Sequence, residues 1–261
     1  MIGLWEYLKT MTDNKTALRF DALIQRKVSP FRREIEREKN RYIDEQVNEL
    51  SRTGRFSDLL LDKHYANMMN IYGNRVRGIM RQSVDFSAST LPFKGLVTLE
   101  RKFSLFDDIV LGYLGQFAAK KIKNITKTTE NDIRRSLEEA EQQFEISEQQ
   151  YAYARIKAKA FSKFRADAIA RTELHQAAMY ASQKNTEALA REVGATVAKK
   201  WTPTVDERTR PAHMAMLGKD AIAMDGKFDV GGEMLERPGD PNGSAANVIN
   251  CRCVLTYETD F

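Results

Sequence analysis

The chain has 261 residues, of which 42% are apolar and 30% charged, and its formal net charge is +5. This apolar fraction can supply a core, and the scarcity of glycine and proline beside so much charge argues against a β-sandwich and favours long amphipathic helices. No apolar run approaches the roughly 18 residues of a membrane span, and no basic leader precedes an apolar stretch, so we expect a soluble cytosolic product.

The first part of the chain predicts paired amphipathic helices. Apolar residues recur three and four apart over residues 31–50 and again over residues 57–80, with charges of both signs between them. Residues 86–95 (FSASTLPFKG) are small and polar and include a proline and a glycine. We therefore expect two one-faced helices followed by a connection.

Capping signals predict where the later helices begin. Ser104 precedes an apolar stripe, and Thr129 and Ser147 are each followed three residues on by an acidic or amide side chain, as in a capping box. The alanine-rich stripe over residues 151–188 predicts one long helix, or two in succession, ending before Gly194. Alanine on the inner face predicts tight packing.

After Gly194 the pattern changes from helical spacing to short strands. Residues 196–201 (TVAKKW) and 251–258 (CRCVLTYE) predict strands, and residues 208–217 a short helix. Residues 221–230 predict a hairpin about a type I′ turn at Asp225-Gly226. So few strands predict a small antiparallel sheet, covered by the alanine-rich helix.

These elements predict an α+β fold, in which a helix-rich N-terminal region is followed by a small C-terminal domain with long helices and a short antiparallel sheet. We predict three segments. Residues 1–128 form a helical arm, residues 129–193 form long helices that lead to and cover the C-terminal module, and residues 194–261 form that small β-rich module.

The two cysteines, Cys251 and Cys253, lie two residues apart near the C-terminus. On a strand their side chains would point the same way, and they are too close in sequence for an ordinary disulfide. The pair therefore indicates a reducing compartment.

Four short motifs follow one another in the last third of the chain. They are ARTELH (170–175), WTPTVDERTRPAH (201–213), PGDPNGS (238–244) and NCRC (250–253). Together they resemble the head-morphogenesis, or Mu F-like, minor capsid proteins of tailed bacteriophages. In that family the C-terminal domain pairs an ARTE-type helix with a W…D-x-R-T-R-x-x-H stretch and closes on N-C-R-C. ARTE or CRC alone would occur by chance, whereas four motifs in this order are specific.

The chain departs from the family pattern just before NCRC. Many relatives carry His-Pro there, and this chain has Val248 and Ile249. Any role that requires a histidine at that place is therefore in doubt.

The resemblance implies a minor component of the phage head that is made with the portal protein, binds it, and acts in head assembly and in DNA packaging or delivery. Such a protein would be made in the host bacterial cytoplasm and reside in the head interior, without membrane contact. The arm would dock on portal or capsid, and the C-terminal module would lie near double-stranded DNA. On this interpretation the chain is not an enzyme and needs no cofactor.

The motif residues predict a structural network of charge-assisted bonds, because carboxylates and guanidiniums can interlock through bidentate pairs. In a module with little sheet, such bonds would fix the loops. The predicted set is Arg171, Glu173, Trp201, Asp206, Arg208, Arg210, His213, Asn250, Cys251, Arg252 and Cys253.

A metal site is the alternative for part of this set. His213, Cys251 and Cys253 are ligand types that zinc accepts, and Asp206 could be the fourth ligand. Against it, zinc sites favour C-x₂-C over C-x-C, and a histidine on a short helix is more often simply packed. With three protein ligands and a water, a metal-dependent hydrolase or a toxin-like effector that also uses Glu173 becomes conceivable.

A nucleotide-binding or transferase site at Arg171, Thr172 and Glu173, with Glu173 as base, is the other enzymatic alternative. The sequence shows no glycine-rich phosphate loop or nucleophile elbow that would support it. His64 and His175 are expected on helix surfaces or in satisfied packing.

Two basic stretches, residues 120–127 (KKIKNITK) and 155–165 (RIKAKAFSKFR), suit sequence-independent contacts with DNA phosphates. The candidate residues are Lys120, Lys121, Lys123, Lys127, Arg155, Lys157 and Lys159. An ordinary solvated helix face is the competing interpretation, since the charge is spread along the chain.

Overall fold

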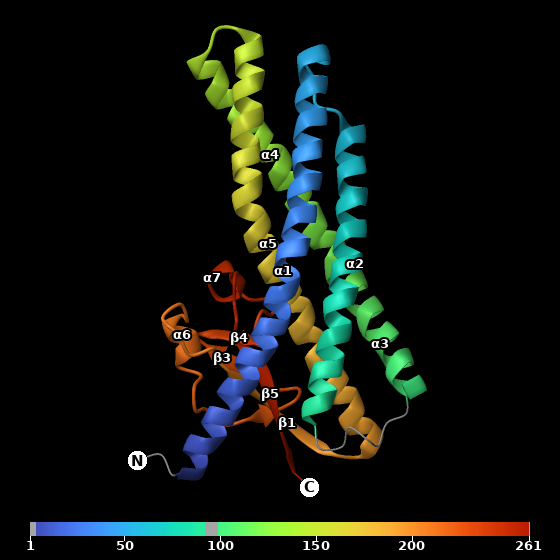
Figure 1. Cartoon of the computed structure of the whole chain (residues 1–261), viewed down its shortest axis with the longest axis vertical. Helices are drawn as coiled ribbons and strands as arrows, with labels where there is room; N and C mark the ends of the chain where they lie inside the picture. Colours follow the sequence, from blue (N-terminus) through green and yellow to red (C-terminus); the bar gives the residue numbers. More distant parts are fainter. Residues whose placement is uncertain (1–3, 92–98, 261) are drawn as a thin grey trace. The chain divides into compact units, whose positions relative to one another are not determined.

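The structure, a computed structural model, describes residues 4–91 and 99–260. Five long helices precede the strands, and the fold is α+β, as the sequence predicts (Figure 1). The helices are α1 (Leu4–Thr53), α2 (Asp58–Thr90), α3 (Leu99–Tyr113), α4 (Ala119–Gln143), α5 (Ser147–Val193), α6 (Pro211–Met214) and α7 (Ala245–Val248), with a π-helical turn, η1 (Leu114–Ala118). The strands are β1 (Thr196–Thr202), β2 (Ile222–Ala223), β3 (Phe228–Val230), β4 (Glu233–Leu235) and β5 (Val254–Asp260). Within the described residues no helix has the length and apolar character to cross a membrane.

The chain forms two compact units from non-consecutive segments. The sheet unit comprises Met1–Lys27, Val76–Tyr113 and Arg171–Phe261, and the bundle unit comprises Val28–Arg75 and Leu114–Ala170. Helices α1, α2 and α5 contribute to both units. The three segments predicted along the sequence are a different kind of division and stay a prediction.

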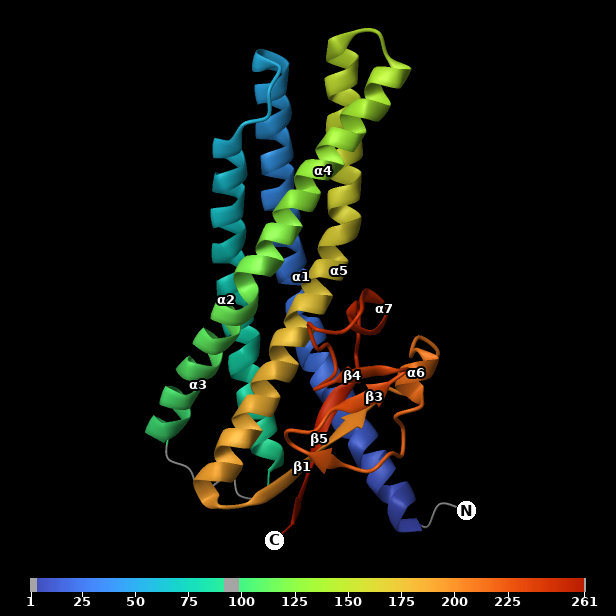
Figure 2. The same ribbon diagram turned by 180° about the vertical axis from the view of Figure 1, so that it is seen from behind.

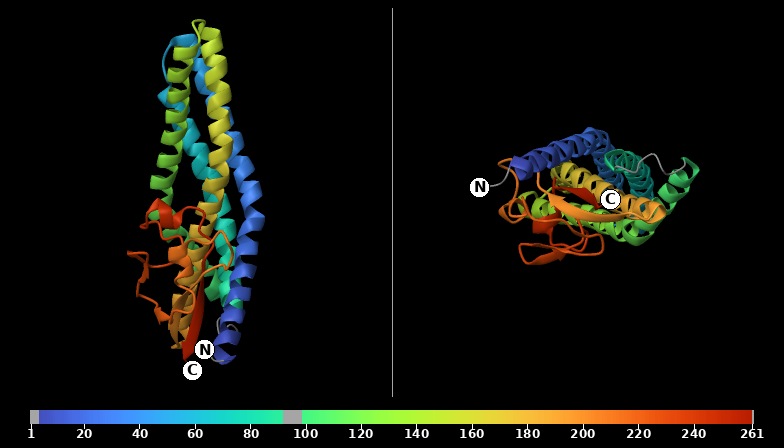
Figure 3. Two further views of the ribbon diagram at one scale, coloured as in Figure 1. Left: turned by 90° about the vertical axis from the view of Figure 1, so that its left-hand side faces the viewer. Right: turned by 90° about the horizontal axis from the view of Figure 1, so that it is seen from below.

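In the bundle unit, parts of α1, α2, α4 and α5 run side by side (Figures 1 and 2). Helices α4 and α5 are antiparallel and are joined by a short turn (Figure 3). The apolar faces of the four helices meet in one cluster, formed by Tyr42, Ile43, Val47, Leu50, Ile133 and Ala158, with Leu60 and Leu61 packed against it. The helices predicted over residues 31–50 and 57–80 are therefore confirmed, and both are longer than predicted.

A lysine lies inside this bundle. Lys39 has no exposed surface, and its Nζ has no hydrogen-bond partner among the described residues. Burial, the largest cause, and the charge of Arg165 together lower the pKa of Lys39 to about 8, against the opposing effect of Asp132. A buried ammonium without a partner destabilises the folded state.

The sheet unit is built around β1. Strand β1 pairs antiparallel with β5 from Thr196↔Asp260 to Thr202↔Val254, and on its other edge with β2, so the order is β2-β1-β5. The C-terminal half of α5 covers this sheet, with Leu189 and Ala190 packed on Val197. The small antiparallel sheet and its helical cover are thus as predicted.

The predicted hairpin about Asp225-Gly226 is wrong. Strand β2 pairs with β1, and β3 pairs with β4 across Gly231-Gly232, whose φ angles are 63° and 87°. Two successive positive φ angles suit a tight two-residue turn. Neither Asp225 nor Gly226 has a positive φ, so they cannot form a type I′ turn.

Two of the predicted helix starts are also wrong. Helix α3 begins at Leu99, before Ser104, and α4 continues through Thr129. The hydroxyl of Thr129 donates to the carbonyl of Ile125 in its own helix (2.9 Å), so it is satisfied without ending the helix. The start at Ser147 and the single long helix ending before Gly194 are confirmed.

Two further boundaries differ from the prediction. The connection expected over residues 86–95 begins later, because α2 continues to Thr90, and residues 92–98 lie outside the described part of the chain. Strand β5 begins at Val254, so Cys251 and Cys253 lie in the loop before it and not on a strand. Both are free thiols.

Candidate functional site

The four sequence motifs converge within the sheet unit. On α5, the hydroxyl of Thr172 accepts a hydrogen bond from the backbone N–H of Asn250 (3.1 Å), and His175 Nε2 donates to the carbonyl oxygen of Cys253 (2.8 Å). Asn250 has a φ of 56°, the left-handed conformation that asparagine tolerates better than most residues. The ARTELH helix thus holds both ends of the NCRC loop.

A bidentate ion pair joins the DERTR and NCRC motifs. Both guanidinium nitrogens of Arg252 donate to Asp206, at 2.6 and 2.5 Å, and the backbone N–H of Arg208 donates to the same carboxylate at 3.0 Å. The hydrogen bonds from Arg252 hold the pKa of Asp206 well below its usual range. Asp206 is therefore an ionised clamp and has little basicity for acid–base chemistry.

The Asp206→Asn variant is expected to lower the free energy of unfolding by about 1–2 kcal/mol near neutral pH, because it removes a charge-assisted pair that is only partly exposed. The effect should shrink as the pH falls below the ordinary aspartate pKa, because the unfolded chain then binds a proton at Asp206 that the folded protein, in which the pKa of Asp206 is lowered, does not bind. Urea unfolding of both proteins at pH 7 and pH 3 would check this. An equal difference at the two pH values would contradict it.

Other contacts close the same region. The guanidinium of Arg210 donates to the carbonyl oxygen of Ile249, and the hydroxyl of Thr204 donates to the carbonyl oxygen of Arg252 (2.8 Å). Arg171 donates to Gln25 Oε1 (3.1 Å), and Glu173 is half-buried on α5. Of the predicted motif residues, Trp201 is a buried core residue of the module, packed with Phe228 and Leu235 among others.

His213, Cys251 and Cys253 are brought together in the core of the module. One ligand atom of each lies within 4.8 Å of the others, and all three residues are buried. His213 Nδ1 is 3.3 Å from Cys253 Sγ and 3.7 Å from Cys251 Sγ. Asp206 is not in this group, because Arg252 holds it at another place, so the predicted fourth ligand is wrong.

The surroundings of the group fix its geometry. His213 Nε2 donates to Asn247 Oδ1 (3.3 Å), Asn247 Nδ2 donates to the carbonyl oxygen of Val230 (3.2 Å), and the Trp201 ring lies edge-on to the imidazole at 5.4 Å. Burial raises the pKa of Cys251, whereas a hydrogen bond from Cys251 lowers the pKa of Cys253. The two thiols therefore differ in acidity, and Cys253 is the more acidic of the two.

An arginine-lined cavity of about 330 Å³ adjoins this group. Its lining includes four arginines of the motifs, together with Asn250 and Cys251; the arginines are Arg171, Arg208, Arg210 and Arg252. Such a concentration of guanidiniums favours anions, and carboxylate or phosphate groups match their geometry.

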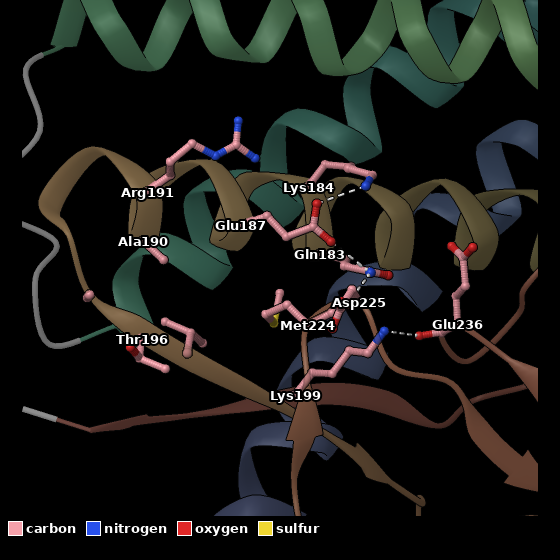
Figure 4. Close-up of a pocket in the computed structure, with 12 residues that line it drawn as sticks. Gln183, Lys184, Glu187, Ala190, Arg191, Thr196, Lys199, Met224, Asp225 and Glu236 are labelled. Atoms are coloured by element: carbon pink, nitrogen blue, oxygen red, sulfur yellow. Dashed lines mark hydrogen bonds and ion pairs between the residues drawn. The ribbon is translucent and has the colours of Figure 1, made fainter.

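A second cavity, of about 660 Å³, lies between α5 and the sheet (Figure 4). Lys199 is fully buried there and donates to the carbonyl oxygen of Glu236 (2.8 Å), and Lys184 pairs with Glu187 (2.8 Å). Burial lowers the pKa of Lys199 to about 8, against the opposing charges of Glu236 and Glu187. Sequence reasoning missed this lysine, although its position between buried Val197 and Trp201 on one strand face was a signal.

The two predicted basic stretches lie on α4 and α5 in the bundle unit, where several of these cations meet carboxylates. Lys159 pairs with Asp44 (2.7 Å), Arg155 approaches the same carboxylate (3.5 Å), and Lys157 pairs with Glu139. Lys127 pairs with Glu130, and Lys120 and Lys123 are exposed. Phosphate binding by these residues would compete with the intramolecular pairs and stays a prediction.

The other two histidines are buried and not on helix surfaces, and each has one ring nitrogen without a hydrogen-bond partner among the described residues, so their packing is not fully satisfied as expected. His64 is buried, with Nδ1 3.0 Å from Glu38 and its ring stacked on Tyr42 at 4.4 Å. His175 is buried, and desolvation lowers its pKa. Neither lies in the His213 group.

Residues 114–256 match the family described as "Phage Mu protein F like protein", and this span is more than half of the chain. The chain belongs to the phage Mu protein F-like family. Membership indicates a phage head morphogenesis protein and therefore a component of the virion.

One relative of this Mu F-like chain is an NAD(+)--arginine ADP-ribosyltransferase of Enterococcus faecalis, 35% identical over 92 residues. The match covers 35% of this chain and 18% of the relative, so the chain spans less than a fifth of that protein's length. No solved structure matches the chain.

Proposed function

We propose that this Mu F-like protein acts by binding and not by catalysis: a minor head protein that docks on the portal or capsid, lies in the head interior near packaged DNA, and serves assembly and DNA packaging or delivery. The observation that carries this proposal is the Asp206–Arg252 clamp. The Asp206 carboxylate is held ionised by two hydrogen bonds from the Arg252 guanidinium. This arrangement suits a rigid structural link and not proton transfer.

The ADP-ribosyltransferase relative gives weak support to the enzymatic alternative. The matched part is 18% of that protein, so the activity given in its name need not reside in this part. A transferase role for Arg171 and Glu173 would require an open site in which Glu173 acts as base. The arginine-lined cavity beside Arg171 favours instead the binding of an anion, and DNA phosphates are the anions that a head protein meets in quantity.

For docking on another head protein, α5 offers an apolar stripe within the bundle unit. Ala152, Ile156, Ala160 and Phe164 follow one another four residues apart, and all are exposed. Ile156 is 72% and Phe164 83% exposed, which is unusual for side chains of this size. An exposed stripe at helical spacing is the surface that helix-in-groove recognition uses, so we place the docking contact here.

The paired variant Ile156→Asp/Phe164→Asp should reduce co-purification with the cognate portal oligomer at least about tenfold, as loss of central apolar anchors does at protein interfaces. The measurement is affinity capture of co-expressed portal and variant, quantified against wild type. Substitutions are preferable to deleting the arm, because residues 1–27 and 76–113 belong to the sheet unit.

The matched control is Leu59→Asp/Leu111→Asp, which places the same charges at exposed leucines of the arm, 78% and 63% exposed. It should leave co-purification unchanged. If the control variant lost co-purification with the portal and the α5 variant retained it, docking would be assigned to the predicted arm of residues 1–128. Equal thermal unfolding midpoints would show that each variant is folded.

A further inference from the structure

We propose that His213, Cys251 and Cys253 bind a zinc ion, with the histidine ligating through Nδ1. With Zn–S bonds of about 2.3 Å and a Zn–N bond of about 2.0–2.1 Å, tetrahedral coordination places the nitrogen about 3.5 Å from each sulfur. The two N–S separations in the protein, 3.3 and 3.7 Å, bracket that value. A zinc ion would therefore need only small side-chain adjustments.

The histidine is already oriented for this role. Nε2 carries the proton that it donates to Asn247 Oδ1, and Asn247 is itself held by the carbonyl oxygen of Val230. This leaves Nδ1 as the lone-pair nitrogen facing the two sulfurs. Zinc-bound histidines commonly donate their other N–H to such an oxygen, which fixes the tautomer and the ring orientation.

The C-x-C spacing is compatible with a shared ion because the cysteines lie in a loop and not on a strand. Asn250 has a left-handed conformation just before Cys251, and His175 holds the carbonyl oxygen of Cys253. These constraints come from two different elements and present both sulfurs to His213. The conformation of the loop therefore holds the two sulfurs close together, although neither cysteine lies on a strand.

Simple core packing does not account for the group as well. Two cysteines can be small apolar core residues, but an imidazole nitrogen enclosed with them among Trp201, Phe228 and Leu235 has only weak sulfur partners. A metal would satisfy all three groups at once. It would also tie α6 to the NCRC loop in a module whose sheets are small, where such a link adds most to stability.

The fourth position is open to water or to a small anion. Among the described residues, no further histidine, cysteine, aspartate or glutamate joins the group. Cys251 belongs both to this group and to the lining of the arginine-lined cavity. The principal role that we infer is structural, because three protein ligands and the surrounding core are all buried.

Metal analysis of the full-length protein tests the proposal. Protein purified without chelator under reducing conditions should carry about one zinc per chain, and Cys253→Ser should carry less than about one tenth of that. The wild-type protein refolded with Co²⁺ should show the thiolate-to-cobalt charge-transfer band and the d–d absorption of a tetrahedral site. This second readout does not depend on a variant that could fail to fold.

The control is His64→Gln, which alters a buried histidine of the bundle unit and no residue of the proposed site, and it should retain zinc. A wild-type protein that stays metal-free after incubation with excess Zn²⁺, or a cobalt spectrum without thiolate bands, would overturn the proposal. A Cys251–Cys253 disulfide that persists in protein purified under reducing conditions would overturn it as well.

Discussion

The Lys39→Met variant is expected to raise the free energy of unfolding by about 3 kcal/mol at pH 7, because a depression of the pKa from 10.5 to about 8 corresponds to that cost of keeping the ammonium buried. Methionine has a similar length and flexibility and fills the same space without a charge. Since Lys39 has no exposed surface, little solvent screening reduces the effect.

The pH dependence of the free energy of unfolding tests independently whether the buried ammonium of Lys39 is destabilising. The pKa of Lys39 is lower in the folded protein than in the unfolded chain, so the unfolded chain binds more protons between about pH 8 and pH 10.5. Wild-type stability should therefore gain from Lys39 as the pH rises through that window, and the variant should lack this gain. Lys199 contributes a rise of the same sign in both proteins, which the difference between them removes.

Urea unfolding at pH 7.0 and pH 9.5 would measure both effects, with the difference between variant and wild type smaller at the higher pH. Lys123→Met, at an exposed position in the same unit, is the matched control and should change stability by less than about 0.5 kcal/mol. A destabilised Lys39→Met protein would mean that the ammonium has a favourable partner in the bundle.

The Gly239→Ala variant is expected to destabilise the sheet unit by about 3 kcal/mol, from the combined costs of a left-handed backbone and of overpacking. Gly239 has a φ of 72°, and a Cβ there would lie 2.7 Å from His175 Nδ1. The His175 ring cannot easily give way, because its other nitrogen holds the carbonyl oxygen of Cys253. The PGDPNGS motif thus has a glycine where the chain passes against the ARTELH helix.

Gly194→Ala is the matched control for this prediction. Its φ is 68°, but nothing lies within 4 Å of the added Cβ, so only the backbone cost of about 1 kcal/mol should appear. Chemical unfolding of both variants would separate the contact with His175 from the backbone strain. Equal losses in the two variants would show that the contact is unimportant.

Helical periodicity predicted most of the helical fold, because each long helix buries one face and its apolar spacing is visible in the sequence. Helix starts were less predictable. Thr129 has the sequence context of a cap, yet its hydroxyl bonds to Ile125 within a continuing helix. Such an intrahelical bond and a capping bond require the same side chain, so the residue type cannot distinguish them.

The presence of a small antiparallel sheet was predicted correctly, but the pairing of its short strands was not. Asp225-Gly226 and Gly231-Gly232 both have turn composition, and only the backbone conformation shows that the second pair makes the hairpin. At the candidate site, the resemblance singled out residues that do converge, but not how they pair. Asp206 and Arg252 are 46 positions apart, and their pairing is what removes Asp206 from the group around His213.

The sheet unit draws its parts from residues 1–27, 76–113 and 171–261. Nearly the whole chain must therefore be synthesised before this unit can fold. Until then, the part of α1 that belongs to the sheet unit lacks its packing partners from residues 171–261. Contacts so distant along the chain form slowly. The bundle unit, whose segments end at Ala170, can fold earlier, so the nascent protein contains one ordered unit before the sheet unit is complete.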